Sequence, residues 1–367
     1  MEKTKNIIII VSLSALLLAG FLLCSFLPKE TFSVAERRPL AEKPVVSTET
    51  VFSGEFTKDF EAYATDHFPF REGFRRVKAV FARDVFKKLD TNGLFVAEGH
   101  ISKIDDPENE KMMQHAAERI AFIQNTYLKG KNCNQYFAIV PDKNMFLAGE
   151  NGYPSLDYKG FGERMQGMVL GVEYIDVSPL LELSDYYTTD THWRQEKITD
   201  VAEYIGAAMG TPLAEEYQVE TLENPFYGVY AGQLALPIEP DTITYLTNEA
   251  LKNTVVTYYD TGAPVEGAMY NMEKAFGKDP YEMFLSGAAP IVTLENPMAS
   301  SQKELVLFRD SFASSLAPLL SAGYAKITLV DIRYIQSNFV GSFVDFENAD
   351  VLFIYSTALL NNSLALR

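Results

Sequence analysis

The sequence predicts an α/β domain built on a mainly parallel sheet and preceded by a hydrophobic N-terminal helix. Two observations support this prediction. From about residue 91 onward, apolar runs of strand length alternate with segments of helical periodicity, which is typical of parallel sheets. Near the N-terminus, the stretch from Ile7 to Leu27 contains no charged residue and is long enough to cross the hydrocarbon core of a membrane.

The composition excludes several classes of protein. Hydrophobic residues make up 47% of the 367 residues, which is too apolar for a disordered chain. The formal net charge of −17 would repel phosphate backbones, so we do not expect nucleic acid as a partner. Cys24 lies in the hydrophobic run, so we expect no disulfide with Cys133. Because the histidines show no zinc-binding spacing, we expect neither a metal nor a cofactor.

Residues 1–28 are predicted to form an uncleaved membrane anchor. A cleaved signal peptide is the alternative, but the apolar run is long for one and no small-residue cleavage site follows it. Basic residues on both sides of the run leave the orientation open, whereas a long downstream domain is translocated largely regardless of charge. We therefore expect a single-pass protein of the cell membrane with residues 29–367 outside the cytoplasm.

Two segments separate the anchor from the α/β domain. Residues 29–50 contain prolines and several charges and are predicted to be an extended linker. Residues 51–90 are predicted to be helical, because apolar residues recur at intervals of three and four in two stripes: Phe52, Phe56, Phe60 and Tyr63, and then Phe74, Val77, Phe81 and Val85. The sequence Asp66-His67-Phe68-Pro69-Phe70-Arg71 interrupts the helical pattern between them.

Residues 91–367 are predicted to form the α/β domain. The expected helices cover residues 108–128, 160–170, 194–209 and 312–321. The expected strands cover residues 136–140, 172–177, 305–308, 327–332 and 351–355. Residues 210–300 are rich in Thr, Tyr, Pro and Gly and are predicted to be an irregular insertion beside the sheet, with short β-like runs at 242–247 and 254–259.

The most informative segment runs from Leu305 to Ser315. It predicts a strand, a tight turn and a helix, with Ser311 at the junction. Ligands bind at the carboxyl ends of strands in open α/β sheets, and amides at the start of a helix can hold an oxyanion. Ser311 is therefore a candidate nucleophile. The alternative is that Ser311 or Asp310 merely caps the helix.

A second segment, Tyr186 to Arg194, could supply the base. A serine nucleophile needs a histidine base and a carboxylate that orients it, and Asp190 lies two residues before His192. Such a pair also occurs by chance. Trp193, the single tryptophan of the chain, either walls the site or anchors the following helix.

Together the two segments resemble the DHHW protein family and the related alginate O-acetyltransferase proteins of the SGNH-hydrolase-like group. The resemblance rests on Thr-Asp-Thr-His-Trp at 189–193 and Arg-Asp-Ser-Phe at 309–312, and it extends to residues 66–71, 330–334 and 351–355. It implies a flavodoxin-like three-layer α/β/α sandwich with a triad of Ser311, His192 and Asp190. Two positions depart from the pattern: Thr191 replaces the family's first histidine, and Arg309 replaces the glycine of the usual Gly-Asp-Ser block.

The resemblance implies an extracytoplasmic enzyme that transfers an acetyl group to a polysaccharide through an acylated Ser311. It also implies that a membrane-bound acyltransferase partner could deliver the acetyl group. A carbohydrate esterase and a non-catalytic, glycan-binding scaffold protein of a cell-envelope synthesis complex remain alternatives, as does an exported domain in which both motifs only cap helices.

Other residues have weaker predicted roles. Arg309, Trp193 and Lys143 are candidate substrate contacts, although Lys143 also fits a surface position after a strand. We expect Asp66 and His67 to be structural. We expect Arg333 to pair with Asp331 or another carboxylate.

Overall fold

The computed structural model describes residues 2–26, 28–213, 216–260 and 262–367. The chain divides into two compact units. The first comprises Met1–Asn92 and Ala231–Ile238, and the second comprises Gly93–Tyr230 and Glu239–Arg367. Each unit is described below by itself.

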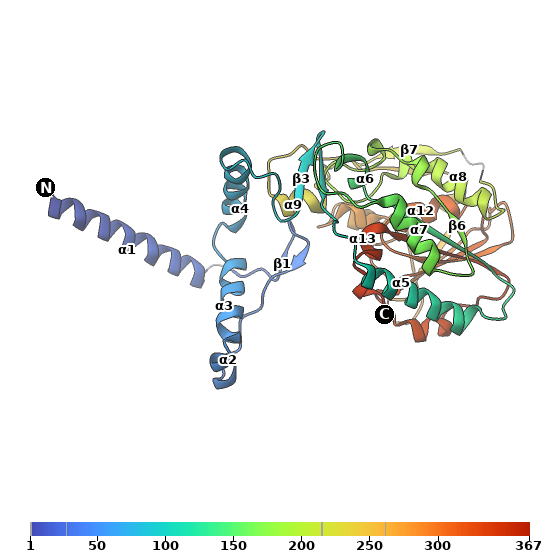
Figure 1. The fold of residues 1–367 in the computed structure, drawn as a ribbon, viewed down its shortest axis with the longest axis horizontal. Helices are drawn as coiled ribbons and strands as arrows, with labels where there is room; N and C mark the ends of the chain where they lie inside the picture. Colours follow the sequence, from blue (N-terminus) through green and yellow to red (C-terminus); the bar gives the residue numbers. More distant parts are fainter. Residues whose placement is uncertain (1, 27, 214–215, 261) are drawn as a thin grey trace. The chain divides into compact units, whose positions relative to one another are not determined.

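The first unit contains the hydrophobic helix α1, Glu2–Phe26 (Figure 1). Within the described residues, α1 is the one helix long and apolar enough to cross a membrane, by length and composition, and none of it is buried. A signal sequence would meet the same criteria. Leu27, the last residue of the predicted apolar run, lies outside the described residues.

The segment expected to be an extended linker is instead partly ordered. It forms a two-stranded antiparallel ladder of β1, Phe32–Ser33, and β2, Arg38–Pro39. The Arg38 guanidinium donates two hydrogen bonds, of 2.8 and 2.6 Å, to the Asp66 carboxylate, and it holds the pKa of that carboxyl down to about 2. His67 Nε2 lies 2.9 Å from the Ala41 carbonyl oxygen. The sequence does not reveal this order because both partners of each contact are far apart along the chain.

The predicted helical segment forms α2, α3 and α4, and a π-helical turn, η1, continues α4. The breaks between the helices fall at Gly54, which has a φ of +82°, and between Asp66 and Arg71. The bounds are Thr48–Ser53 for α2, Glu55–Asp66 for α3, Arg71–Val80 for α4 and Phe81–Val85 for η1.

The second unit is built on an eight-stranded sheet of order β10-β9-β11-β13-β12-β14-β5-β6. The strands from β13 to β6 pair in parallel, and β9, β10 and β11 extend the sheet with antiparallel pairing. The sheet is thus mostly parallel, as predicted. The parallel strands are β5, Asn134–Val140; β6, Glu173–Ile175; β12, Glu304–Arg309; β13, Lys326–Val330; and β14, Ala349–Ser356.

The prediction that residues 210–300 lie beside the sheet is wrong for three strands of this region. These are β9, Val255–Tyr258; β10, Val265–Gly267; and β11, Ile291–Glu295. The strand β10 is exposed throughout and β9 begins with an exposed residue, so neither has the continuous apolar run of the central strands, whereas four of the five residues of β11 are buried. Residues 214, 215 and 261 of this region lie outside the described residues.

The remaining strands of this unit form two small ladders. One pairs β3, Leu94–Ala97, with β4, His100–Lys103, and the other pairs β7, Gln218–Thr221, with β8, Thr244–Thr247. The helices are α5, Glu110–Ile123; α6, Asn144–Leu147; α7, Tyr158–Met168; α8, Thr199–Ala208; α10, Glu249–Asn253; α11, Met272–Ala275; α12, Ala313–Leu320; and α13, Thr357–Leu360. The helix α9, Val229–Leu234, begins in this unit and continues into the first.

Short helical turns complete the second unit. A π-helical turn, η2, Gln124–Leu128, continues α5. The 3-10 turns are η3, Ser178–Leu180; η4, Leu183–Asp185; η5, Gln195–Lys197; η6, Pro280–Met283; η7, Ser337–Ser342; and η8, Ser363–Ala365. The helix expected over residues 194–209 therefore starts only at Thr199, because η5 and the non-helical backbone of Ile198 precede it.

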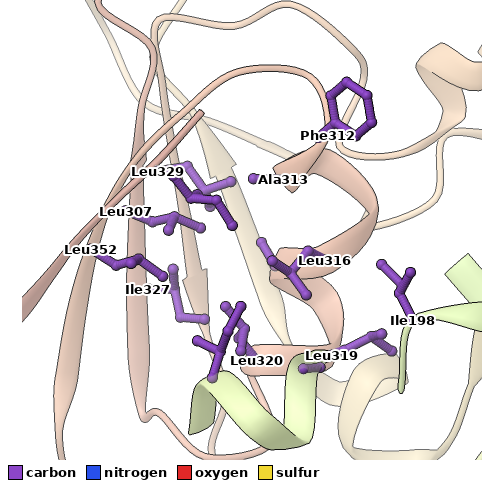
Figure 2. Packing of buried hydrophobic residues seen from close by; sticks show 14 of the residues in the cluster. Ile198, Leu307, Phe312, Ala313, Leu316, Leu319, Leu320, Ile327, Leu329 and Leu352 are labelled. Atoms are coloured by element: carbon purple, nitrogen blue, oxygen red, sulfur yellow. The ribbon is translucent and has the colours of Figure 1, made fainter. Parts of the chain in front are cut away.

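Apolar side chains cover both faces of the sheet. Alternate residues of β12 enter two separate clusters: Leu305 and Leu307 point to one face, and Val306 and Phe308 to the other. Helices α8 and α12 pack on the first face, and α5 and α7 pack on the second. Figure 2 shows Leu316 and Leu320 of α12 directed toward the sheet residues Leu307, Ile327, Leu329 and Leu352. This packing fixes the helix that follows Ser311.

Candidate active site

Ser311 lies at the carboxyl edge of the parallel strands. Ser311 follows β12, which pairs with β13 on one side and with β14 on the other, so the strand order reverses direction at β12. A reversal of this kind opens a crevice beyond the strand ends, and ligands of open α/β sheets bind there. The turns after β14 and β5 reach the same edge and carry Thr357 and Lys143.

Ser311, His192 and Asp190 form a continuous hydrogen-bonded chain. His192 Nε2 lies 2.7 Å from Ser311 Oγ, and His192 Nδ1 lies 2.6 Å from Asp190 Oδ1. Both distances are within the range for a nucleophile, a base and a group that orients the base. Asp190 is fully buried and His192 nearly so, whereas Ser311 is partly exposed. The two predicted segments, more than a hundred residues apart, thus meet in the folded chain.

The second oxygen of Asp190 is held by a neighbouring loop. Asp190 Oδ2 accepts a hydrogen bond of 2.8 Å from the Val229 amide, and Oδ1 accepts a second bond of 3.1 Å from the His192 amide. Gly228 makes this approach possible, because a Cβ at this position would lie 2.4 Å from Asp190 Cβ. With both oxygens engaged, the carboxylate has a defined orientation toward the imidazole.

Two ionic groups, the buried Lys143 and the half-buried Asp241, hold the loop that carries Asp190. The Lys143 ammonium donates to the carbonyl oxygens of Tyr187, Thr188 and Asp190, at 2.7, 3.1 and 2.7 Å. The Asp241 carboxylate accepts bonds from the amides and the hydroxyls of Thr188 and Thr189, at 2.5 to 2.8 Å. The loop is therefore fixed from its carbonyl side by a cation and from its amide side by an anion.

Lys143 is neither a surface residue nor placed to contact substrate. It is 1% exposed, and the three carbonyl oxygens take all three protons of its ammonium group. Burial lowers the pKa of Lys143 to about 7, while Asp190, Asp241 and Asp142 act in the opposite direction. The sequence shows that Lys143 follows a strand, but nothing in the local pattern indicates that the loop would cover it.

The turn at Ser311 is held by the preceding aspartate. Asp310 Oδ1 accepts a bond of 3.0 Å from the Phe312 amide, and Oδ2 accepts one of 2.7 Å from the Ser356 amide at the end of β14. Helix α12 begins without a side-chain cap. The Ser311 hydroxyl is bonded to His192 rather than to the helix, so the capping alternative does not describe it.

Most amides at the start of α12 are already used. Those of Phe312, Ala313 and Ser314 donate to oxygens of Asp310 and Ser311. Within residues 311–314 of the described chain, the Ser311 amide is thus the remaining candidate donor to an oxyanion. The sequence led us to expect several free amide donors at the start of the helix, whereas the structure leaves one candidate among these four residues.

Two aromatic rings enclose His192. Tyr281 stacks on the imidazole with ring centroids 3.9 Å apart and an interplanar angle of 8°, and Phe312 lies 5.0 Å away at 55°. The Tyr281 hydroxyl lies 3.0 Å from Ser315 Oγ in α12. Burial raises the pKa of the Tyr281 phenol well above its usual range, so the ring stays neutral. Tyr281 belongs to the region predicted to be an irregular insertion, and no motif indicated it.

Trp193 and Arg309 are buried beside the site, where both are bonded to groups of the protein. Trp193 Nε1 lies 3.0 Å from the Phe312 carbonyl oxygen and 3.0 Å from Ser315 Oγ, so the indole joins the His192 segment to α12. Arg309 donates to Ser314 Oγ at 2.9 Å and lies 4.0 Å from Asp331. Each residue is at most 1% exposed, which does not agree with the predicted role of either in substrate binding.

Arg333 pairs with Asp331, in line with the sequence expectation, through bonds of 2.9 and 2.6 Å. Because Asp331 is fully buried and also faces Arg309, it has a cation on each side. Arg309 is the last residue of β12, so this cluster fixes the end of the strand that leads into Ser311.

A cavity of about 520 Å³ opens at the same edge of the sheet, next to the strands β5 and β6. Its walls include the aromatic rings of Tyr158, Phe161 and Tyr174, and its polar groups include those of Gln166, Asp176 and Thr357. Thr357 follows Ser356, which is bonded to Asp310. The described lining of this cavity does not include Ser311, His192 or Asp190, and Ile139 and Phe161 of its wall belong to the apolar cluster on the other face of the sheet from Phe312.

Solved structures with the same fold support the predicted structural relation. A DHHW family protein from Eubacterium siraeum is 20% identical to this chain, covers 76% of it with 95% of its own length, and superposes with a TM-score of 0.60. PatB1 of Bacillus cereus, in a structure with a sulfonyl adduct, is 19% identical, covers 73% of this chain with 95% of its own, and has a TM-score of 0.58. The predicted relation to DHHW family proteins is thus confirmed at the level of the fold.

A more distant match is the O-acetyltransferase domain of Pseudomonas putida AlgJ, which is 13% identical, covers 73% of this chain with 92% of its own, and has a TM-score of 0.44. No protein-family model and no curated protein matches this chain.

Proposed function

We propose that the chain is an extracytoplasmic O-acyltransferase, with an SGNH-hydrolase-like α/β domain, that moves an acetyl group to a hydroxyl of a polysaccharide. The observation that carries this proposal is the chain of contacts from Ser311 Oγ through His192 to Asp190, at 2.7 and 2.6 Å. This arrangement matches the geometry that serine acyl transfer requires. The motif resemblance to DHHW and alginate O-acetyltransferase proteins favours an acetyl group and a glycan acceptor.

In the proposed mechanism, His192 Nε2 takes the proton of Ser311 as Oγ attacks the acyl carbonyl carbon. The carbonyl oxygen becomes an oxyanion that the Ser311 amide faces. When the intermediate collapses, the bond to the donor oxygen breaks and His192 returns its proton to that oxygen. An acceptor hydroxyl then gives its proton to His192 and attacks the acyl carbonyl carbon. As this second intermediate collapses, the bond between that carbon and Ser311 Oγ breaks and His192 returns the proton to Oγ. Asp190 remains ionised and stabilises the imidazolium through both steps.

A cavity at the same edge of the sheet as Ser311 has the character of a saccharide-binding site. The cavity beside β5 and β6 combines aromatic rings with amide, carboxylate and hydroxyl groups, which is the mixture that sugar rings contact. A cavity of about 520 Å³ is large enough for more than one ring. The acidic surface of the chain is compatible with a neutral glycan.

We further propose that α1 anchors the chain and that the α/β domain lies outside the cytoplasm. The length and apolar composition of α1 support a membrane span. Anchorage would place Ser311 near a membrane-bound acyltransferase partner that could supply the acetyl group. Such a partner is inferred from the family resemblance.

Replacing Ser311 with Ala tests the nucleophile. We expect the release of acetate from a chromogenic acetate ester to fall by at least about 10³-fold in kcat, because the attacking oxygen is lost while the fold is kept. A sulfonyl fluoride or fluorophosphonate should add one adduct to the parent, at Ser311 by peptide mass, and none to the variant. Retained activity in Ser311→Ala, or an adduct on another residue, would contradict the triad assignment.

Adding oligosaccharides to the same assay separates transfer from hydrolysis. A transferase should yield acetylated oligosaccharide, by mass spectrometry, at the expense of free acetate. Production of free acetate alone would favour the esterase alternative. If Ser311 neither labels nor turns over an ester, the non-catalytic scaffold alternative would replace the proposal.

A further inference from the structure

The helix α4 and its continuation η1 differ in charge from the rest of the chain. The whole chain has a formal net charge of −17, yet basic residues outnumber acidic ones between Arg71 and Lys88. The exposed acidic residues there are Glu72 and Asp84. The exposed basic residues are Arg76, Lys78, Arg83, Lys87 and Lys88.

The same helix exposes a continuous apolar stripe. Phe74, Val77, Phe81 and Val85 recur at intervals of three and four, so they lie on one side of the helix. Each of these side chains is between 52% and 60% exposed. The spacing that predicted this helix is therefore present, but its apolar side chains point to solvent. Phe86, which follows η1, is 70% exposed and extends the apolar surface.

Another side of the helix makes the contacts that hold it in its unit. Ala79 and Ala82 are buried there, Arg71 lies 2.5 Å from Glu36, and Arg75 donates to the carbonyl oxygens of Gly232 and Gln233. Small residues and internal ion pairs fix this side. Of the apolar stripe, Phe74 makes an edge contact with Phe68 of the same unit, with ring centroids 5.5 Å apart. All four side chains of the stripe still have more than half of their surface exposed, and that surface can meet a partner outside the unit.

Basic residues beside an exposed apolar stripe are the features of helices that lie in the interface of a membrane. Such helices combine one apolar side with a strongly charged one, as α4 does, and their basic residues are attracted to anionic headgroups. A protein partner that used the stripe alone would not require the surplus of Lys and Arg. The chain also carries its candidate membrane span, α1, before this helix.

We propose that Arg71–Lys88 is a second membrane-binding element, which lies in the surface of an anionic bilayer with Phe74, Val77, Phe81 and Val85 in the acyl region. This surface is independent of the acyl-transfer site, and it rests on the proposed membrane anchorage of α1. The binding would hold the segment that leads into the α/β domain at the bilayer surface, close to the level of the headgroups.

Site-directed spin labelling of the full chain tests this proposal. The native cysteines are removed by Cys24→Ser and Cys133→Ser, and one nitroxide is attached at Val77→Cys or Val85→Cys. A label at Arg76→Cys, on the charged side of the same turn, is the matched control. Each protein is reconstituted in vesicles of phosphatidylcholine alone or with phosphatidylglycerol, and collisions with oxygen and with a water-soluble nickel chelate are measured.

We expect the ratio of oxygen to nickel accessibility at Val77 and Val85 to rise several-fold when phosphatidylglycerol is present, while Arg76 stays accessible to nickel. Reversing the charges with Arg76→Glu, Lys78→Glu and Arg83→Glu should return the Val77 label to nickel. Labels at Val77 and Val85 that reach nickel equally in both vesicles would overturn the proposal. Labels shielded from both reagents would also overturn it, because they would show that a second copy covers the stripe. Alkaline extraction of the same vesicles reports the insertion of α1 separately.

Discussion

Lys143 acts on the candidate triad without touching the nucleophile or the base. Its ammonium is bonded to three carbonyl oxygens of the loop that carries Asp190, and one of these belongs to Asp190 itself. We therefore regard it as a positioning residue. A buried carbonyl that loses its donor is costly, and a displacement of about 1 Å in a catalytic group can reduce a rate by about 10²-fold.

Replacing Lys143 with Met should accordingly lower kcat for ester hydrolysis by on the order of 10²-fold. KM should change little, because Lys143 is buried away from the surface on which substrate would bind. Lys111→Met, on the exposed side of α5, is the matched control and should keep parental kinetics. An unchanged kcat in Lys143→Met would show that the Asp190 loop holds its position without the cation.

The lowered pKa of Lys143 gives activity and stability opposite responses to pH. Only the protonated amine donates to all three carbonyl oxygens, so activity should decline as pH rises through about 7. The unfolded chain keeps the proton up to the usual value of 10.5, and it therefore binds more protons than the folded chain between about 7 and 10.5. The contribution of Lys143 to stability should rise with pH across that interval. Comparing pH profiles of kcat and of the unfolding midpoint, followed by Trp193 fluorescence, in parent and Lys143→Met isolates both effects.

At the residue scale, short motifs predicted the three residues of the candidate triad but not the groups that hold them. Ser311, His192 and Asp190 each lie in a recognisable local pattern, with a strand-turn-helix around one and an Asp-x-His around the others. Tyr281, Asp241 and the Val229 amide reach the site from segments that are distant in the sequence. No local spacing can reveal such a contact, and the burial of Arg309 and Trp193 likewise depends on the helix packed over them.

At the scale of elements, the central strands were predictable because they are buried on both faces. The strands β5, β12, β13 and β14 are continuous apolar runs, a pattern that only a covered parallel strand requires. The stripe of α4 predicted the helix correctly, but spacing alone cannot distinguish a stripe that faces a core from one that faces solvent. The edge strand β10 is exposed throughout and lacks a strong pattern, whereas β9, which pairs with β10 and β11, lies within the β-like run predicted at 254–259.

The loop around Gly228 brings the Val229 amide to the Asp190 carboxylate, and a methyl group at position 228 should separate these two groups. In Gly228→Ala, the added Cβ would lie 2.4 Å from Asp190 Cβ and 2.4 Å from the Thr189 carbonyl oxygen, so the Val229 amide must withdraw from Asp190. We expect a loss of kcat on the order of 10²-fold and a destabilisation of about 1–3 kcal/mol, typical of overpacking in a close-packed interior.

The matched control for this substitution is Gly167→Ala. Gly167 lies on the exposed side of α7, where an added Cβ meets nothing within 4 Å, so alanine should leave activity unchanged and stabilise the helix slightly. Full activity of Gly228→Ala would mean that the Asp190 orientation does not depend on the Val229 amide.

At the scale of the whole molecule, the candidate triad belongs to one unit of the chain and both proposed membrane-binding elements belong to the other. The hydrophobic helix α1 contributes nothing to either apolar cluster of the α/β unit, and all residues of the candidate triad belong to that unit. The order of the elements could be predicted from the sequence because each has its own periodicity. The sequence could not predict that residues 231–238 belong to the first unit, because this depends on contacts between segments distant in the chain.

Removing residues 1–28 should therefore release the chain from the membrane without altering kcat on a soluble ester. Because none of α1 is buried, its loss exposes no core and should leave the unfolding midpoint within about 1 °C of the parent. If Arg71–Lys88 also binds lipid, the shortened chain should retain weak binding to vesicles that contain phosphatidylglycerol. That residual binding should disappear at about 1 M salt, where the Debye length is about 3 Å, whereas the parent should remain in the bilayer. Cosedimentation of both chains with vesicles at low and high salt measures the two attachments separately. A shortened chain that stays bound at high salt would contradict the anchoring role of α1.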